Sequence, residues 1–252
     1  MGLNITRKDW SYLIKRIIIL GDDLLDFLFP VYCEICNLRL QRERYICQVC
    51  LNKITYLTPP CSLSRREPLV LQNEMMSKDG QESKQHLEEK VISLGKYEGI
   101  LKDYLHLLKY NHKPYLEVLF PKIIKEDYLF WIKPYQFDYI IPVPLHPKKL
   151  RSRGYNQAEL IAKYLSKVYK ISLSKNNLRR KRETLPQVNL GKKERFDNVK
   201  DSFTVKDKEK LKDKRVLLVD DVYTTGSTVN ECYQELKKSK VRKVIILTLA
   251  RS

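Results

Sequence analysis

The sequence predicts an α/β protein in which a parallel sheet is flanked by helices, with a four-cysteine zinc finger near the N-terminus. Short apolar runs such as Val216–Val219 are typical of parallel strands that are covered on both faces. A helical pattern at Val229–Lys238 follows this run, and a second strand pattern follows at Lys243–Leu249, which is the alternation expected of an α/β fold. The four cysteines occur as two C-x2-C pairs, a spacing typical of zinc sites.

The chain of 252 residues, 43% of them hydrophobic, can form one large domain with an appendage. We expect an N-terminal helix and zinc-finger module at residues 1–62, a linker at 63–90 and the main domain at 91–252. The linker is expected because Met75–Gln85 is polar and has little apolar surface to bury.

The net charge of +18 and the pI near 9.5 favour an anionic partner: a nucleic acid, a phosphorylated ligand or an anionic surface. Residues 138–215 contain 22 basic and 9 acidic residues, so most of the excess charge lies in one part of the chain. The alternative interpretation is a lysine-rich surface that is merely solvated.

No apolar stretch is long enough for a transmembrane helix, because Asp22, Asp23 and Asp26 interrupt the apolar runs near the N-terminus. A signal-peptide cleavage site is also missing, so we expect a cytoplasmic location. Residues 1–29 carry apolar positions at helical spacing. This helix is expected to pack on the neighbouring module, with contacts to a membrane surface or to DNA as alternatives.

The cysteine pairs predict one tetrahedral metal site. Each C-x2-C pair supplies two thiolates, and ten residues separate the pairs. Disulfides would require an oxidising compartment, for which the sequence has no signal. The zinc is expected to be structural, with Cys61 and Cys232 as packing residues outside the site. Its predicted ligands are Cys33, Cys36, Cys47 and Cys50.

The remaining pattern predicts strands and helices that lead up to Val216. The expected strands are 91–97, 139–143 and 173–178, and the expected helices are 99–110, 115–131 and 156–169. The turn after residue 143 is stiffened by prolines and rich in cations, which suits a pyrophosphate. The basic stretch from Arg179 to Asn198 is expected to be a mobile hood over the site, or else an exposed basic loop.

Two adjacent carboxylates, Asp220 and Asp221, follow the predicted strand at 216–219. Ligands of parallel sheets lie beyond the carboxyl ends of the strands. Neighbouring carboxylates are tolerable where they face ribose hydroxyls or a cation such as Mg²⁺. The row of small residues that follows opens a helix, where backbone N–H groups and the helix dipole favour a phosphate. This row is Thr224, Thr225, Gly226, Ser227 and Thr228. Together the two features describe a sugar-phosphate site, and the alternative is a capped helix without a ligand.

Residues 214–230 resemble the motif with which type I phosphoribosyltransferases bind phosphoribosyl pyrophosphate (PRPP): a hydrophobic run, two acidic residues and TTGST. The resemblance implies that Asp220 and Asp221 meet the ribose hydroxyls and that Thr224–Thr228 hold the 5′-phosphate. It also implies the fold of these enzymes.

The chain as a whole resembles the ComF family, which includes ComFC-like and GntX-like proteins. The motifs that carry the resemblance are FP-x2-C-x2-C at Phe29–Cys36, Y-x-G at Tyr97–Gly99, LKY at Leu108–Tyr110, the segment Ile140–Ala162, R-x-R-x-T-x-P-Q at Arg180–Gln187 and ER-x2-NV at Glu194–Val199. Many members carry a further C-x2-C, of which only Cys61 is present here.

The ComF resemblance implies a competence protein that binds PRPP with Mg²⁺, handles incoming single-stranded DNA and works with a DNA-translocase partner. The alternatives are an active phosphoribosyltransferase with an unidentified acceptor and a regulatory PRPP sensor. We expect the pyrophosphate and hood contacts to come from His146, Arg151, Arg153, Arg180 and Arg182. The expected DNA contacts are Lys148, Lys149, Arg179 and Lys181.

Overall fold

The computed structural model describes residues 28, 30–40, 45–57, 91–110, 113–124, 132, 135–182 and 199–252. The predictions made for the N-terminal helix, the linker, Cys61 and the hood at 183–198 lie outside these residues. Two compact units are present, residues 1–53 and 54–252. Among the described helices, none has both the length and the apolar character needed to cross a membrane.

The larger unit is built on a parallel five-stranded sheet with the order β1-β7-β6-β2-β3. Its strands are β1 (Val91–Lys96), β2 (Tyr139–Pro142), β3 (Ser172–Leu173), β6 (Arg215–Tyr223) and β7 (Lys243–Arg251). The predicted α/β fold with a parallel sheet is therefore confirmed. The two central strands, β6 and β7, are the longest and are almost wholly buried, which explains their continuous apolar runs.

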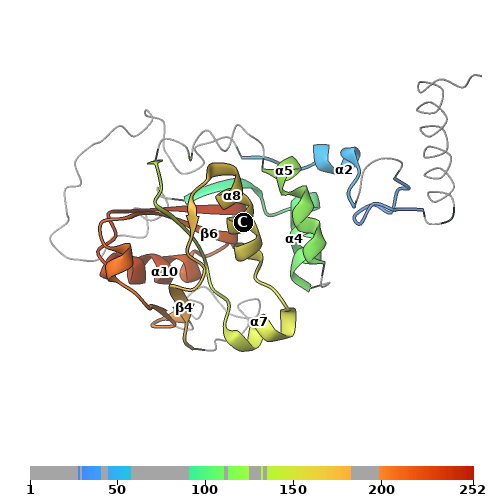
Figure 1. Ribbon diagram of the computed structural model, residues 1–252. Helices are drawn as coiled ribbons and strands as arrows, with labels where there is room; N and C mark the ends of the chain where they lie inside the picture. The colour runs from blue at the N-terminus through green and yellow to red at the C-terminus, as the bar shows by residue number, and fades with distance from the viewer. Residues whose placement is uncertain are drawn as a thin grey trace, which may run out of the picture. The chain divides into compact units, whose positions relative to one another are not determined.

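Helices cover both faces of the sheet. Alternate residues of β6, Val216 and Leu218, pack in one core cluster with Leu236 and other apolar residues of α10 (Ser227–Lys238). The antiparallel pair β4 (Leu178–Arg180) and β5 (Phe203–Val205) lies on the same side, and α8 (Gln157–Tyr169) covers the other (Figure 1). The strands β2 and β6 are each followed by helices, α8 and α10, that pack back on the sheet, as in the usual parallel βαβ arrangement.

The strand predicted at 173–178 is wrong. Residue 173 ends β3, residues 175–177 form a turn, and residue 178 begins β4. The two strands belong to different sheets. The turn is closed by Asn177, whose side chain bonds the backbone of Asp207 in both directions at 2.9 and 2.7 Å. A polar SKNN tract between two apolar residues therefore marked a turn and not a strand.

The helix predicted at 115–131 also differs from the structure. The 3-10 helix η1 (Pro114–Leu119) comes first and is followed by the four-residue helix α5 (Phe120–Ile123). Pro121 is tolerated because it stands in the first turn of α5. By contrast, α4 (Gly99–Tyr110) has the predicted bounds.

Residues 54–57 pair with the free edge of β1. An antiparallel bridge joins Tyr56 to Gly95, and the Tyr56 hydroxyl donates to the Ile123 carbonyl at 3.1 Å. This short segment is therefore part of the larger unit, although it follows the cysteine module directly in sequence.

Candidate functional site

Asp220 and Asp221 lie inside β6, near its carboxyl end, and not after it as the sequence predicted. Asp220 is in register with Thr248 of β7, whose hydroxyl shares a 2.8 Å hydrogen bond with Ser93 of β1. The aspartates therefore stand at the edge of the sheet where ligands of parallel α/β folds bind.

The two carboxylates have different surroundings. Asp221 forms an ion pair with Lys109 of α4, with Nζ 2.9 Å from Oδ2, and the two side chains are only 12% and 18% exposed. Asp220 accepts a hydrogen bond from the Asp221 backbone N–H at 2.9 Å. Burial and the charge of Asp221 raise the pKa of Asp220 to about 7, against the opposing effects of Lys109 and Arg180.

Further cations surround the carboxylates. Although Lys149 is exposed as a whole residue, desolvation of its ammonium group and repulsion by Arg153, Arg180 and Lys109 lower its pKa. Burial lowers the pKa of Arg180, while the Asp220 carboxylate acts in the opposite direction. Four basic side chains around two aspartates leave the site positive, which suits a phosphorylated ligand.

The helix α7 (Pro147–Arg153) supplies the cations predicted after strand β2. His146 caps this helix, because its Nδ1 accepts from the Lys148 backbone N–H at 3.3 Å. Lys148, Lys149 and Arg151 are exposed. Arg153 is half-buried, donates to Gln157 Oε1 at 2.7 Å and lies over the ring of Tyr110 at 5.6 Å from its centroid. Of the α7 cations, Lys149 and Arg153 are thus brought towards the aspartates.

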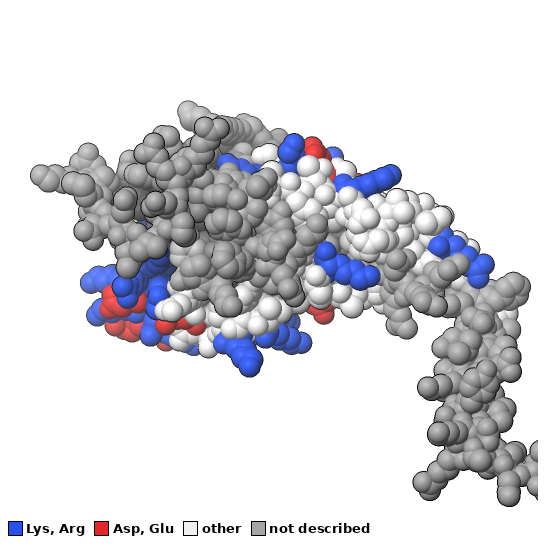
Figure 2. All heavy atoms as spheres, turned by 90° about the horizontal axis from the view of Figure 1, so that it is seen from above, with Lys and Arg blue, Asp and Glu red and all other residues white. Residues whose placement is uncertain are grey.

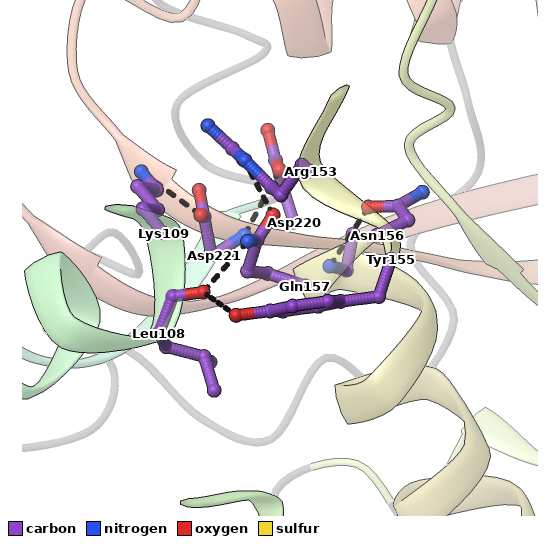
Figure 3. A network of polar contacts seen from close by, with 9 residues as sticks. Leu108, Lys109, Arg153, Tyr155, Asn156, Gln157, Asp220 and Asp221 are labelled. Atoms are coloured by element: carbon purple, nitrogen blue, oxygen red, sulfur yellow. Dashed lines mark hydrogen bonds and ion pairs between the residues drawn. The ribbon is translucent and has the colours of Figure 1, made fainter. Parts of the chain in front are cut away.

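The carbonyl of Leu108 ties the end of α4 to the start of α8 (Figure 3). It accepts a bond of 2.7 Å from the Tyr155 hydroxyl and a bond of 2.8 Å from Gln157 Nε2. Asn156, between these donors, caps α8 and bonds the Val143 carbonyl at 2.9 Å. Helix ends leave their last carbonyls without partners in the helix, and these contacts fill that role for α4.

Sequence reasoning missed this junction and, with it, the place of Lys109 in the site. Leu108–Tyr110 and Ile140–Ala162 both belong to the motifs quoted above, but nothing in their spacing shows that they meet in space. Lys109 is next to the clamped Leu108 carbonyl, so the junction positions its ammonium against Asp221.

The predicted phosphate loop, Thr224–Thr228, leads from β6 into α10. Gly226 has a φ of 76° and stands at the N-cap, where the structure has no side-chain capping bond. The hydroxyls of Thr225 and Ser227 are 2.7 Å apart. Thr224 is exposed, whereas Ser227 is buried. The N-terminus of the 12-residue helix α10 therefore follows the carboxyl end of β6, where a helix N-terminus favours an anion.

The basic residues at the start of the predicted hood point to alternate sides of the chain, because Arg179 and Arg180 belong to a β-strand. In β4, Arg180 lies on the inner side, with its guanidinium 5.2 Å from the centroid of Phe203. Arg179 and Lys181 are exposed. Arg182 is also exposed and donates to the Lys200 carbonyl at 2.8 Å. On the face seen in Figure 2, Lys and Arg side chains occur in several separate groups.

One cavity of about 330 Å³ lies elsewhere and contains none of the predicted site residues. It is lined by residues 173–177 and by Lys206, Asp207 and Lys210.

The four cysteines of the small unit form a cluster. Their Sγ atoms all lie within 4.8 Å of one another, with Cys33 to Cys50 at 3.9 Å and Cys36 to Cys47 at 3.6 Å. Four sulfurs around zinc at about 2.3 Å would be separated by about 3.8 Å, so the donor set fits this metal. The thiols are free, and the sulfurs are too far apart for disulfides.

Backbone N–H groups support the cluster. The Cys47 N–H donates to Cys33 Sγ at 3.4 Å, and the Cys50 N–H donates to Cys47 Sγ at 3.4 Å at the start of α2 (Gln48–Asn52). Burial alone would raise the pKa of Cys33, but the backbone donors lower it to about 7. Such donors favour the thiolate form that a metal ion binds.

Several known proteins are similar to parts of this chain. The phosphoribosyl transferase domain family matches residues 150–252, which contain α8, the phosphate loop and both aspartates. Competence protein F of Haemophilus influenzae is 41% identical over 114 residues, which are 45% of this chain and 50% of that protein. Competence protein ComFC of Streptococcus pneumoniae is 28% identical over 155 residues, 62% of this chain and 65% of that protein.

The chain is thus similar to competence proteins and to DNA utilization proteins. A further relative, DNA utilization protein YhgH of Salmonella typhimurium, is 25% identical over 230 residues and matches 88% of this chain and 98% of its own length. The match to the Haemophilus protein spans only half of that protein's length. The similarity to YhgH thus extends over most of the chain, well beyond the residues that match the phosphoribosyl transferase domain family.

Proposed function

We propose that this protein is a ComF-type competence protein that binds PRPP at the end of β6 and handles incoming single-stranded DNA in the cytoplasm during natural transformation. The observation that carries the proposal is the juxtaposition of the Asp220–Asp221 pair with basic side chains and with the start of α10, whose N-cap residue is Gly226. The ribose diol would donate to the carboxylates, and the 5′-phosphate would cap α10 at Thr224–Thr228.

The diphosphate of PRPP would be held by the cations that α4, α7 and β4 direct at the aspartates. Lys109, Arg153 and Arg180 would be the groups in reach, and Arg151 and Arg182 would be recruited from the surface. His146 would contribute by holding the start of α7 in place. Mg²⁺ would accompany the diphosphate and neutralise part of its charge.

Single-stranded DNA would be bound through its phosphates by exposed basic residues beside this site, Lys148, Lys149, Arg179 and Lys181. The names of the relatives, which refer to competence and DNA utilization, favour DNA over other polyanions. A translocase of the competence machinery would be the protein partner. Zinc in the cysteine cluster would stabilise the small unit.

A calorimetric titration with PRPP tests the sugar-phosphate part. We expect one PRPP per chain for the wild-type protein and none for the Asp220→Ala/Asp221→Ala variant. The Asp103→Ala/Glu209→Ala variant is the control, because both of these acidic residues are exposed. Binding that survives in the first variant would place the ligand elsewhere.

The salt dependence of DNA binding tests the second part. Replacing Arg179 and Lys181 by Ala removes two exposed cations, so the slope of log K against log salt should shrink by about 0.7 for each lost phosphate contact. An unchanged slope would mean that the DNA lies elsewhere on the protein.

The alternative function, transfer of the phosphoribosyl group to an acceptor, uses the same site. Release of pyrophosphate from PRPP in the presence of a nucleobase would favour it. Tight binding without turnover would favour a DNA-handling or sensing role.

A further inference from the structure

The paired aspartates already have a cation supplied by the protein itself. Lys109 Nζ is 2.9 Å from Asp221 Oδ2, and both side chains are largely buried, so the contact is a defined part of the site. Sequence reasoning assigned the task of neutralising two adjacent carboxylates to Mg²⁺ or to ribose hydroxyls. In the structure the Lys109 ammonium group of α4 performs it.

The Lys109 ammonium is fixed by the fold. The carbonyl of the preceding residue, Leu108, is held by two hydrogen bonds from the start of α8, at 2.7 and 2.8 Å. The aliphatic stem of Lys109 therefore starts from an anchored backbone (Figure 3). Breaking the ion pair would leave a largely buried charge unpaired, which is costly.

The surroundings of the pair are poor for a divalent cation. Asp220 Oδ1 accepts a backbone hydrogen bond, and Asp221 Oδ2 is bound to Lys109. Lys149 and Arg180 add positive charge close by. Mg²⁺ demands several oxygen ligands in near-octahedral geometry, and repulsion by three neighbouring cations opposes its entry.

The same carboxylates can still accept hydroxyl donors. A carboxylate has about four lone-pair sites, and one ammonium contact uses only one of them. A ribose diol carries no charge, so the cations do not repel it.

We propose that Lys109 takes the place of a divalent metal ion at the carboxylate pair, so that the ribose phosphate portion of the ligand binds without Mg²⁺. This inference rests on the sugar-phosphate function proposed above. Any Mg²⁺ then enters with the diphosphate of the ligand and is held by the ligand's own oxygens.

Ribose 5-phosphate is the probe, because it has the diol and the 5′-phosphate but lacks the diphosphate that chelates Mg²⁺ in solution. Its Kd is measured by calorimetry for the zinc-loaded protein, first in magnesium-free buffer and then with millimolar Mg²⁺. For the wild-type protein we expect the two Kd values to agree within about threefold, below 1 kcal/mol. For Lys109→Met we expect binding to weaken about tenfold or more without Mg²⁺ and to recover when it is added, because the freed carboxylates can then bind the metal.

Two further variants serve as controls. Lys109→Arg keeps the charge and should remain insensitive to Mg²⁺. Lys102→Met makes the same change at an exposed position of α4 and should behave as the wild type. Binding of Mn²⁺ in the absence of sugar, followed by electron paramagnetic resonance, gives a second readout: none at the pair in the wild type, and one ion in Lys109→Met that Asp221→Asn removes.

The outcomes separate the two proposals. If the wild type binds neither PRPP nor ribose 5-phosphate, the proposed function is wrong, and this inference is wrong with it. If it binds ribose 5-phosphate only with Mg²⁺, or if Lys109→Met remains as insensitive to Mg²⁺ as the wild type, the sugar-phosphate site stands and the role of Lys109 is overturned.

Discussion

The ring of Tyr223 lies directly against Gly226 of the phosphate loop. A Cβ atom added to Gly226 would be 2.5 Å from the Tyr223 hydroxyl oxygen and 2.8 Å from the ring carbon that carries it. Tyr223 is buried, and the guanidinium of Arg251 lies 5.0 Å from its ring centroid. Arg251 thus packs on the Tyr223 ring that supports the phosphate loop. Because of this ring, the loop has room only for glycine at position 226.

Replacing Gly226 by Ala should destabilise the protein and weaken binding of PRPP. Both the positive φ and the collision with Tyr223 oppose the new side chain, so we expect a loss of about 2–3 kcal/mol in the free energy of unfolding. Gly154→Ala is the matched control, because Gly154 also has a positive φ but no atom within 4 Å of the added Cβ. Urea denaturation compares the two, and equal losses would mean that the collision does not matter.

The Leu108 carbonyl should couple Tyr155 to Gln157. Tyr155→Phe removes one donor and should cost about 1 kcal/mol, and Gln157→Leu removes the buried second donor at a similar cost. Because the donors share one acceptor, the double variant should lose more than the sum of the two single variants, since only then is the carbonyl left without a partner. Strict additivity in a double-mutant cycle measured by denaturation would contradict this account of the junction.

The raised pKa of Asp220 predicts a pH dependence of stability. Between its ordinary value of 3.8 and about 7, the folded protein holds a proton on Asp220 that the unfolded chain has lost. The contribution of this group to stability is therefore fully present below 3.8 and is lost as the pH rises through 7. Asp220→Asn should flatten this decline. The free energy of unfolding of the variant, compared with that of the wild type, should therefore be more favourable at pH 7 than at pH 4. The check is the free energy of unfolding at several pH values, and an unaltered slope would show that Asp220 titrates normally.

Asp221→Asn should have the opposite effect on stability. It leaves the largely buried ammonium of Lys109 without its partner, at a cost on the order of 3 kcal/mol. The loss should be smaller in a Lys109→Met background, where no charge is stranded. If Asp221→Asn costs the same in both backgrounds, the ion pair contributes nothing.

Removal of zinc should unfold the small unit alone. We expect chelation to release about one zinc per chain, because four cysteine ligands fill one tetrahedral site. Cys33→Ser should lose the metal, whereas Cys232→Ser, which changes a buried thiol of α10, should retain it. Metal content by mass spectrometry and hydrogen exchange of residues 30–53 report the outcome. Retention of zinc by Cys33→Ser would contradict the assignment.

Long, regular patterns allowed much of this fold to be predicted. The helix at 99–110 has its expected bounds, and the runs at 216–219 and 243–249 lie within the two central strands. These elements are predictable because burial on a face or on both sides leaves a clear hydrophobic period. Short elements were harder to predict from the sequence. β3 has only two residues, and the polar turn between β3 and β4 separates what was predicted as one strand.

Of the candidate site, only the residues that are contiguous in sequence could be predicted together. The aspartates and the phosphate loop are contiguous in sequence, so their proximity follows from one strand and one turn. The contact between Lys109 and Asp221 joins residues that are 112 positions apart, and no local period signals it. The same holds for Leu108 and its partners at the start of α8, which were visible only as separate motifs.

The structure of the protein in complex with PRPP tests the central claim most directly. The account predicts the ribose hydroxyls against Asp220 and Asp221, the 5′-phosphate at the backbone of Thr224–Thr228, and the Lys109 ammonium still within reach of Asp221. PRPP bound away from this edge of the sheet, or a pocket at the two aspartates filled by the protein's own side chains, would contradict it.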